Sequence, residues 1–254
     1  MFDDNEQISE GTGFAISQDG AVFTAAHVVT GRMPIRESDY NDPAVRIFAK
    51  FPGVPLLEYR VAICAINISV ESFTELVQID QALLFPKNPV QLPFTPFTIG
   101  SPPKLGDEVF FAGYSDELDL PFQVDRILRP QTVGASEFIQ AMQRGYRADV
   151  TGPMIKRGVT GNVRRVSASE SAMNTHIECD VFYLDNSIHN GASGGPVVSR
   201  NGMAIGVIVQ RATTSASQSS DPSLVVPSGA TIGLGLQTVR AMYQRLSSAQ
   251  GTAN

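Results

Sequence analysis

Short apolar runs rich in β-branched and aromatic residues recur along the chain, each bounded by Pro, Gly or Asn, and this pattern is typical of β-strands. The segment 11-GTGFAISQDGAVFTAAHVV-29 predicts two strands joined at Asp19-Gly20, a strong hairpin signal, with the second strand ending at His27. Further strands are predicted at 44–49, 57–66, 76–85, 108–114, 122–130, 159–166, 177–184, 196–199, 203–210 and 231–236.

The connecting segments divide the chain. Six prolines between residues 86 and 103 exclude a central strand there. The apolar residues among them predict a packed crossing between two halves of one domain; they are Leu92, Phe94, Phe97 and Ile99. The polar segment 30–44 predicts a surface loop, and the Ser-, Thr-, Ala- and Pro-rich segment 211–230 predicts a mobile loop.

Two segments predict helices. Residues 135–146 could hold a short one. In 237–249 the apolar residues recur at helical spacing and predict an amphipathic C-terminal helix; they are Val239, Met242, Tyr243 and Leu246. The pattern as a whole predicts an all-β body of two halves closed by one helix.

Composition and charge narrow the class of protein. The 254 residues include 22 Gly and 16 Pro, which favours many short strands over long helices. The net charge of −6 and a single short basic cluster, 156-KRGVTGNVRR-165, give no reason to expect nucleic acid as a partner. We interpret that cluster as a solvated strand and turn.

Targeting and cysteine signals are weak. No apolar run approaches the ~20 residues of a membrane span, and the acidic start MFDDNEQISEG does not resemble a secretory signal. We therefore expect no membrane partner and a cytoplasmic location, although a secreted or periplasmic chain trimmed of its leader would look the same. Cys64 and Cys179 are far apart and form no C-x-x-C pair, so neither a metal site nor a redox motif is expected.

The chain has three histidines, so candidate bases are few. His176 lies in a polar segment and His189 precedes the glycine turn, whereas His27 ends a predicted strand. A serine nucleophile needs a base within about 3 Å and a carboxylate that fixes the tautomer of that base. Asp80 suits the carboxylate role because it is the lone acid in an apolar strand, although it could instead cap the strand or face solvent.

Ser193 is the candidate nucleophile, within 189-HNGASGGPVV-198. The G-x-S-x-G pattern at 191–195 also occurs in α/β-hydrolases, but there a helix follows the serine and the histidine comes last. Here Gly194, Gly195 and Pro196 follow, and no histidine lies downstream. A subtilisin-like order needs a catalytic Asp before His27, where Asp19 is already used in the hairpin turn. The order His27, Asp80, Ser193 remains.

These segments resemble the trypsin-like serine proteases of the chymotrypsin fold, and within them the HtrA or Deg protease domains. The resemblance rests on 11-GTGFAISQDGAVFTAAHVV-29, 80-DQALL-84, 105-LGDEVFFAGY-114 and 185-DNSIHNGASGGPVV-198. It implies two six-stranded antiparallel β-barrels and a C-terminal α-helix in one peptidase domain spanning 1–254. The barrels would cover about 8–90 and about 104–236, and the helix 237–249.

The resemblance also implies roles for individual residues. His27 would act as general base and then acid, Asp80 would orient it, and Ser193 would attack the scissile carbonyl. The backbone N–H groups of Gly191 and Ser193 would form the oxyanion hole. The S1 pocket would be lined by Ser187, Val209, Arg211 and Gly233. Because no acid stands at its base, we expect a small or medium apolar P1 residue, with Arg211 able to narrow the pocket.

Some residues depart from the family pattern. Ala192 replaces the aspartate that pairs with a freed N-terminal amine in secreted trypsin-like enzymes, which argues against that activation. Gln81 replaces an apolar residue beside Asp80, and no PDZ-like region follows residue 250. Control of activity would then come from loops or a regulatory protein partner, and the segment 139–158 is either a gate or surface decoration.

We therefore predict a serine endopeptidase that acts on protein or peptide substrates through an acyl-enzyme, without metal or cofactor. The alternative is a catalytically silent scaffold of the same fold that binds peptides or a protein partner. The two hypotheses differ in whether Ser193 reacts.

Overall fold

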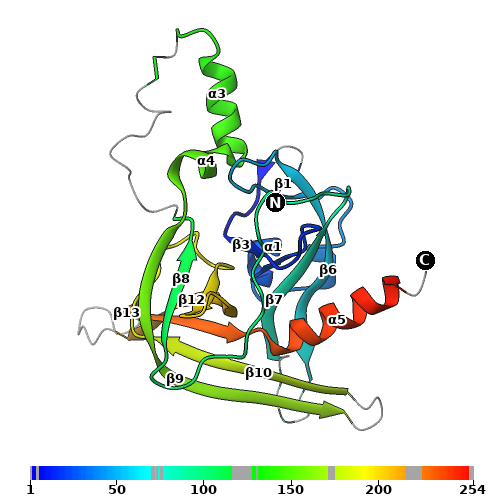
Figure 1. Ribbon diagram of the computed structural model, residues 1–254, viewed down its shortest axis with the longest axis vertical. Coiled ribbons are helices and arrows are strands. Elements are labelled where there is room, and N and C mark those ends of the chain that lie inside the picture. The colour runs from blue at the N-terminus through cyan, green and yellow to red at the C-terminus, as the bar shows by residue number, and fades with distance from the viewer. Residues whose placement is uncertain are drawn as a thin grey trace.

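The computed structural model describes residues 2–3, 6–69, 72, 74, 77–115, 128–129, 131–170, 175–215 and 225–251. Two antiparallel sheets lie side by side, with a helical arm rising above them and a C-terminal helix at the outer side of the first sheet (Figure 1). The predicted all-β fold with a C-terminal helix is confirmed.

The first sheet has five strands among the described residues, where the sequence predicted six. In spatial order they are β3 (Gly13–Ala15), β4 (Val22–Thr24), β7 (Val77–Pro86), β6 (Leu57–Ile68) and β5 (Ile47–Ala49). Gly20, at φ 85°, turns the chain between β3 and β4 as the Asp-Gly signal predicted. Residues 2–3 and 6–7 form the short pair β1 (Phe2–Asp3) and β2 (Glu6–Gln7).

His27 does not end a strand, so that prediction is wrong. β4 stops at Thr24, and His27 lies in the short helix α1 (Ala26–Thr30). The two alanines before His27 favour a helical turn over a strand, and Gly31 ends the helix in the left-handed conformation, at φ 72°. The polar loop that follows contains the 3-10 helix η1 (Glu37–Asp39).

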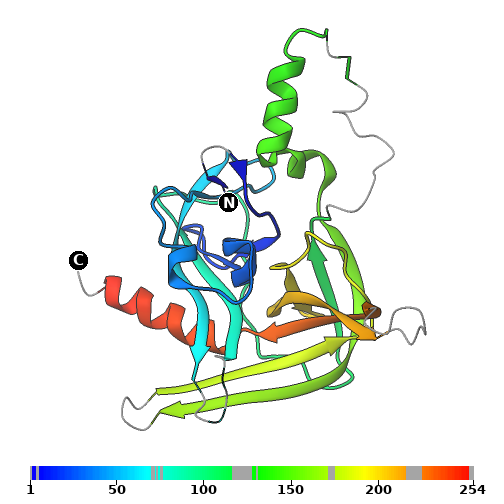
Figure 2. The same ribbon diagram turned by 180° about the vertical axis from the view of Figure 1, so that it is seen from behind.

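The second sheet closes into a six-stranded barrel. Its strands in spatial order are β10 (Thr175–Leu184), β13 (Val225–Gly235), β12 (Ala204–Ser215), β11 (Pro196–Ser199), β8 (Glu108–Gly113) and β9 (Met154–Glu170). Strands β9 and β10 extend well past the barrel as a two-stranded ribbon that runs beneath the first sheet (Figures 1 and 2).

Two predictions about this half need correction. The described parts of the predicted loop 211–230 are strand, because Arg211–Ser215 and 225–230 continue β12 and β13 and pair with each other. The prediction failed because turn-forming composition, rich in Ser, Thr, Ala and Pro, does not exclude backbone pairing between the strands of a hairpin. The predicted strand 122–130 lies almost entirely outside the described residues, and the described residues 128 and 129 are not in a strand.

A shared core joins the two sheets. Phe14, Phe23 and Leu83 from the first sheet pack in one cluster with Val207 and Leu234 from the barrel. The Pro-rich crossing is packed as predicted at three of its four apolar positions: Leu92 is buried, and Phe97 and Ile99 pack against buried clusters. Phe94 is more exposed but contacts the ring of Phe51.

Helix α5 (Gln237–Gly251) follows β13 directly and reaches back to the first sheet. Val239 is buried in the shared core, and the ring of Tyr243 stacks on that of Phe85 in β7, 6.2 Å between centroids. The helix therefore ties the end of the barrel to the first sheet. No helix in the described part of the chain is long and apolar enough to cross a membrane.

Between β8 and β9 the chain forms a helical arm, defined here as residues 131–153. It contains α3 (Ala135–Ala141), the π-helical turn η2 (Met142–Tyr146) and α4 (Arg147–Thr151). The predicted helix at 135–146 is therefore confirmed, with a break at Gly145 (φ 98°).

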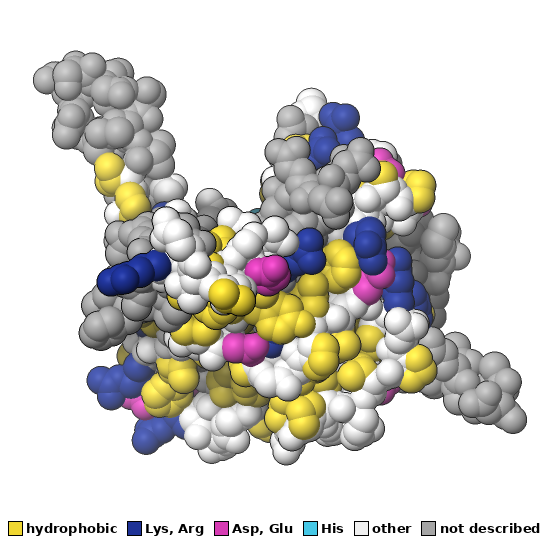
Figure 3. Space-filling view, turned by 90° about the horizontal axis from the view of Figure 1, so that it is seen from above, with side chains coloured by type: hydrophobic (Ala, Val, Ile, Leu, Met, Phe, Trp, Pro, Cys, Tyr) yellow, Lys and Arg dark blue, Asp and Glu magenta, His cyan; other side chains and the backbone are white. Residues whose placement is uncertain are grey.

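On the face seen from above, Lys and Arg side chains are dispersed among hydrophobic and acidic ones (Figure 3).

Candidate active site

His27 in α1 and Asp80 in β7 form a close pair. Asp80 Oδ2 lies 2.6 Å from His27 Nδ1, and Asp80 Oδ1 accepts a hydrogen bond from the backbone N–H of His27 at 2.9 Å. The side chain of Asp80 is 13% exposed and that of His27 28%. A carboxylate at this distance favours the tautomer with its proton on Nδ1, which leaves Nε2 free to accept a proton.

Asp80 and Gln81 are neighbours in β7 but make their contacts on different sides of the strand. Strand β7 alternates its side chains, so Asp80 and Gln81 point to opposite faces. Gln81 is 1% exposed, and its Nε2 donates to the carbonyl of Gly235 at the end of β13, at 2.8 Å. The polar residue that departs from the family pattern therefore links the two sheets, while its neighbour faces the histidine.

The serine turn packs tightly against the strand and turn that precede His27. Gly194, at φ 85°, has no room for a side chain, because a Cβ there would lie 2.0 Å from the carbonyl oxygen of Thr12 and 3.0 Å from the nitrogen of Ala25. A Cβ on Gly195 would lie 2.0 Å from the carbonyl oxygen of Ala112. The two glycines let the Ser193 backbone approach both sheets, which a residue with a side chain would prevent.

The hydroxyl of Ser193 faces a carbonyl. Its Oγ donates to Val209 O at 3.4 Å, a long hydrogen bond, and among the described residues it makes none with the His27 imidazole. Hydrogen bonds between catalytic groups are often long or poorly aligned without substrate and tighten only when a substrate is bound. The structure thus brings His27 and Asp80 together and places the Ser193 turn beside them, with the hydroxyl turned towards β12.

The predicted oxyanion residues are held through their carbonyls. Gly191 is at φ 82°, and its carbonyl oxygen accepts a hydrogen bond from the hydroxyl of Thr12 at 2.8 Å. The carbonyl of Ser193 accepts one from the backbone N–H of Thr12, also at 2.8 Å. Sequence reasoning missed Thr12; the only local signal was its place between Gly11 and Gly13.

The predicted S1 residues lie on β12, on β13 and in the loop that precedes Ser193. Val209 turns its carbonyl towards Ser193, and Arg211 reaches over from β12 to donate to the side-chain oxygen of Asn190 at 2.7 Å. The carbonyl of Ser187 accepts from Lys156 Nζ at 2.5 Å. A Cβ on Gly233 would lie 2.5 Å from the ring of Phe182, so this glycine backs onto the barrel core.

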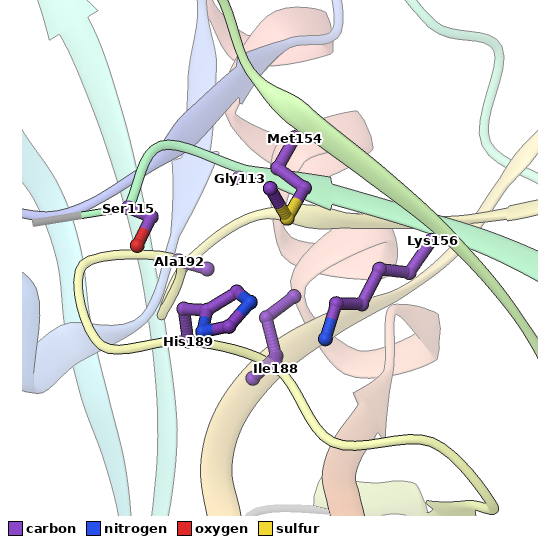
Figure 4. Close-up of a pocket in the computed structure, with 7 residues that line it drawn as sticks. All are labelled: Gly113, Ser115, Met154, Lys156, Ile188, His189 and Ala192. Atoms are coloured by element: carbon purple, nitrogen blue, oxygen red, sulfur yellow. The ribbon is translucent and has the colours of Figure 1, made fainter. Parts of the chain in front are cut away.

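A small pocket lies under the serine loop (Figure 4). Its lining residues come from the ends of β8 and β9 and from the loop before Ser193; they are Gly113, Ser115, Met154, Lys156, Ile188, His189 and Ala192. In the close-up, the amine of Lys156 extends along the loop that carries Ile188 and His189. His189 is thus beside the site, whereas His176 lies on β10 with 57% of its side chain exposed, near Glu178.

The arm reaches from the barrel to the first sheet. Asp149 Oδ1 lies 2.6 Å from Lys50 Nζ and accepts a hydrogen bond from the N–H of Gly53 at 3.0 Å. The Lys50 amine also lies 4.9 Å from the ring centre of Tyr146. These contacts lower the pKa of Asp149, chiefly through the hydrogen bond from Lys50. The segment suspected as a gate is therefore docked across the two sheets at its α4 end.

Metal and thiol chemistry find little support in the described part of the chain. Its His, Cys, Asp and Glu side chains form no group of three that could hold a metal ion. Cys64 and Cys179 are free, and burial raises the pKa of each thiol to about 12. The arrangement suits proton transfer by His27, oriented by Asp80, next to a hydroxyl.

Comparisons with known proteins identify a family for the chain. The profile of the trypsin-like peptidase domain matches residues 11–207. No curated protein matches the chain.

Solved structures match over most of the chain. The Rv3671c protease from M. tuberculosis is 20% identical in its active form (92% of this chain, 71% of that one, TM-score 0.48) and 18% identical in its inactive form (93% and 83%, TM-score 0.50). The HtrA-type protease AlgW, solved with a decapeptide, is 15% identical over 94% of this chain and 52% of its own (TM-score 0.51). At such identities, the matches with TM-scores of 0.50 and 0.51 show a shared fold and no more.

Proposed function

The chain belongs to the trypsin-like peptidase domain family, and from this premise we propose that it is a serine endopeptidase using His27, Asp80 and Ser193. The observation that carries the proposal is the contact of 2.6 Å between His27 Nδ1 and Asp80 Oδ2 beside the glycine-lined turn of Ser193. That contact presents Nε2 as the base, on the side of the ring away from the carboxylate.

The proposed reaction has two steps, acylation of Ser193 and hydrolysis of the acyl-enzyme. Ser193 Oγ attacks the scissile carbonyl carbon while its proton moves to His27 Nε2; the tetrahedral intermediate then collapses, and the imidazolium returns that proton to the leaving amine. Water adds to the acyl-enzyme in the same way, with His27 first taking and then giving back a proton. Asp80 stays ionised and stabilises the imidazolium, and the N–H groups of Gly191 and Ser193 receive the negative charge of the carbonyl oxygen.

The orientation of the Ser193 hydroxyl favours a second candidate, a silent scaffold that binds peptides. A hydroxyl directed at Val209 O has to rotate towards His27 before it can lose its proton. Rotation about χ1 of a serine is an ordinary side-chain motion. The two candidates therefore differ in a measurable way, namely whether the serine can be acylated or phosphonylated.

The test is covalent labelling with a fluorophosphonate probe, with Ser193→Ala as the matched control. We expect labelling of the native chain, no labelling of the control and a mass increase on the peptide that contains Ser193. Absence of labelling across a range of pH, and with candidate partner proteins added, would leave the scaffold as the function.

We further propose a small or medium apolar P1 residue. The contact between Arg211 and Asn190 joins β12 to the loop that precedes Ser193, which would restrict the entrance between them. The amine of Lys156 lies beside the carbonyl of Ser187, so a basic P1 side chain would meet a cation there. A peptide library should show cleavage after small apolar residues, and Arg211→Ala should extend cleavage to larger ones; equal profiles for both proteins would contradict the assignment.

A further inference from the structure

Thr12 is hydrogen-bonded to the serine loop at two points. It is 5% exposed, at the start of the first sheet. Its hydroxyl donates to Gly191 O at 2.8 Å and accepts from the backbone N–H of Tyr114 at 2.9 Å. Its own backbone N–H donates to Ser193 O at 2.8 Å, and its carbonyl accepts from Thr24 Oγ1 at 2.6 Å. Every polar group of this residue is therefore engaged.

The pattern of these bonds is specific. Gly191 and Ser193 are the two residues whose N–H groups are proposed to bind the oxyanion, and Thr12 holds the carbonyl of each of them. The loop segment that carries both donors is thus fixed at two points, on either side of Ala192. The residue that fixes it belongs to the first sheet, whereas the loop belongs to the barrel.

We infer that Thr12 is a positioning residue for the oxyanion hole: it fixes the peptide planes that follow Gly191 and Ser193, and so limits the directions in which the N–H groups of the adjoining planes, those of Gly191 and Ser193, can point. The inference deepens the proposed function and rests on it.

The chemistry makes such a residue consequential. An oxyanion donor is effective only if it points at the place where charge develops, and removal of one donor lowers kcat by about 10²–10³. Gly191 has a positive φ and no side chain, so its peptide planes rotate at little steric cost. The bond from the Thr12 hydroxyl restrains the Gly191–Ala192 peptide plane, and so removes one of the two rotations that would move the neighbouring Gly191 N–H. The bond from Tyr114 N–H fixes the direction in which that hydroxyl points.

A merely structural threonine would have the same burial, and the experiment has to separate the two roles. Thr12→Val keeps the shape and the backbone N–H but removes the hydroxyl; Thr12→Ser keeps the hydroxyl. Thr238→Val is the matched control, because Thr238 is 6% exposed and its hydroxyl donates to a backbone carbonyl, that of Glu178, away from the serine loop. All proteins are full-length, and their melting temperatures are measured.

We expect Thr12→Val to lower kcat and the second-order rate of fluorophosphonate labelling by about 10-fold to 100-fold, short of the loss of a whole donor, with KM changed by less than about 3-fold. Thr12→Ser should stay within about 3-fold of the native rate, and Thr238→Val should change the melting temperature without changing kcat. Should Thr12→Val fail to fold, Thr12→Cys is compared with Thr12→Ser, because a thiol is a weak donor.

The outcomes are distinguishable. Suppose that the native chain labels at Ser193. If Thr12→Val labels at the same rate, or if its kcat is unchanged and only its KM rises, the inference is overturned and the proposed function stands. Equal rates for the Cys and Ser variants overturn it in the same way. If the native chain does not label at all, the proposed function itself has failed.

Discussion

Replacing Asp80 with asparagine changes one atom at the centre of the proposed triad. Asparagine keeps an oxygen that can accept the backbone N–H of His27, which the carboxylate holds at 2.9 Å, so the fold around α1 should survive. At the other position an NH₂ group would face Nδ1, which now lies 2.6 Å from a carboxylate oxygen. A donor there forces Nδ1 to accept, so the proton moves to Nε2 and the imidazole can no longer act as the base.

The expected loss follows from that tautomer change. The equivalent substitution in this class of triad lowers kcat by about 10⁴, and at 1.36 kcal/mol for each factor of ten this is about 5.5 kcal/mol of transition-state stabilisation. The melting temperature should change little, because the backbone contact remains. A single exposed ion pair could not produce such an effect, since it contributes about 1 kcal/mol or less.

The assay is the rate of fluorophosphonate labelling at Ser193, followed by kcat on a peptide taken from the cleavage profile. Asp180→Asn serves as the control, because Asp180 is a buried carboxylate, at 3% exposure, whose side chain pairs with Arg165 and Gln237 and not with His27 or the serine loop. It should lower the melting temperature and leave the rate unchanged. A rate for Asp80→Asn within 10-fold of native would refute the role assigned to Asp80.

Three further results are expected. Arg46 and Lys87 lower the pKa of Glu58 from 4.5 to about 2. The stability that these pairs contribute is therefore present above pH 4.5 and lost as the pH falls towards 2. In urea unfolding, the stability of Glu58→Gln should differ from that of the native protein at pH 7 and converge with it near pH 2. Cys64 and Cys179 should resist a thiol reagent at pH 8 in the folded protein, and two thiols should react after unfolding; fast reaction of either in the native state would contradict their burial. Asp149→Asn should lower stability by about 1 kcal/mol and speed amide exchange in the arm, because Lys50 loses its partner; unchanged exchange would show that the arm is held otherwise.

The sequence was most informative where periodicity and turn chemistry agree. The Asp19-Gly20 turn, the Pro-rich crossing and the C-terminal helix all follow from local signals. Residues 211–215 did not, because the strands of a hairpin that leaves the barrel can carry small polar side chains while their backbones pair. Local composition reflects burial more directly than it reflects backbone pairing.

Only some residues of the candidate site could be predicted from the sequence. His27, Asp80 and Ser193 could be found because their residue types, order and flanking segments are distinctive. Thr12 could not, because a threonine beside a strand has no local property that predicts a bond to a glycine carbonyl in another sheet. The resemblance assigned Gly233 to S1, and the sequence alone could not show that the register of β13 directs the side-chain position of this glycine towards Phe182. Register is a tertiary property that one sequence does not fix.

The contacts between Thr12 and the serine loop also determine when the site can assemble during protein synthesis. The ribosome makes the residues of the first sheet, together with His27 and Asp80, before it makes Ser193 or Ile208, whose carbonyl holds the N–H of Gly194. At translation rates of about 5–20 residues per second, this interval lasts on the order of 10 s. A growing chain would carry a base but neither a nucleophile nor an anchored loop, so it could not cleave its neighbours. Hydrolysis would begin only when the late half of the chain docks on the early half.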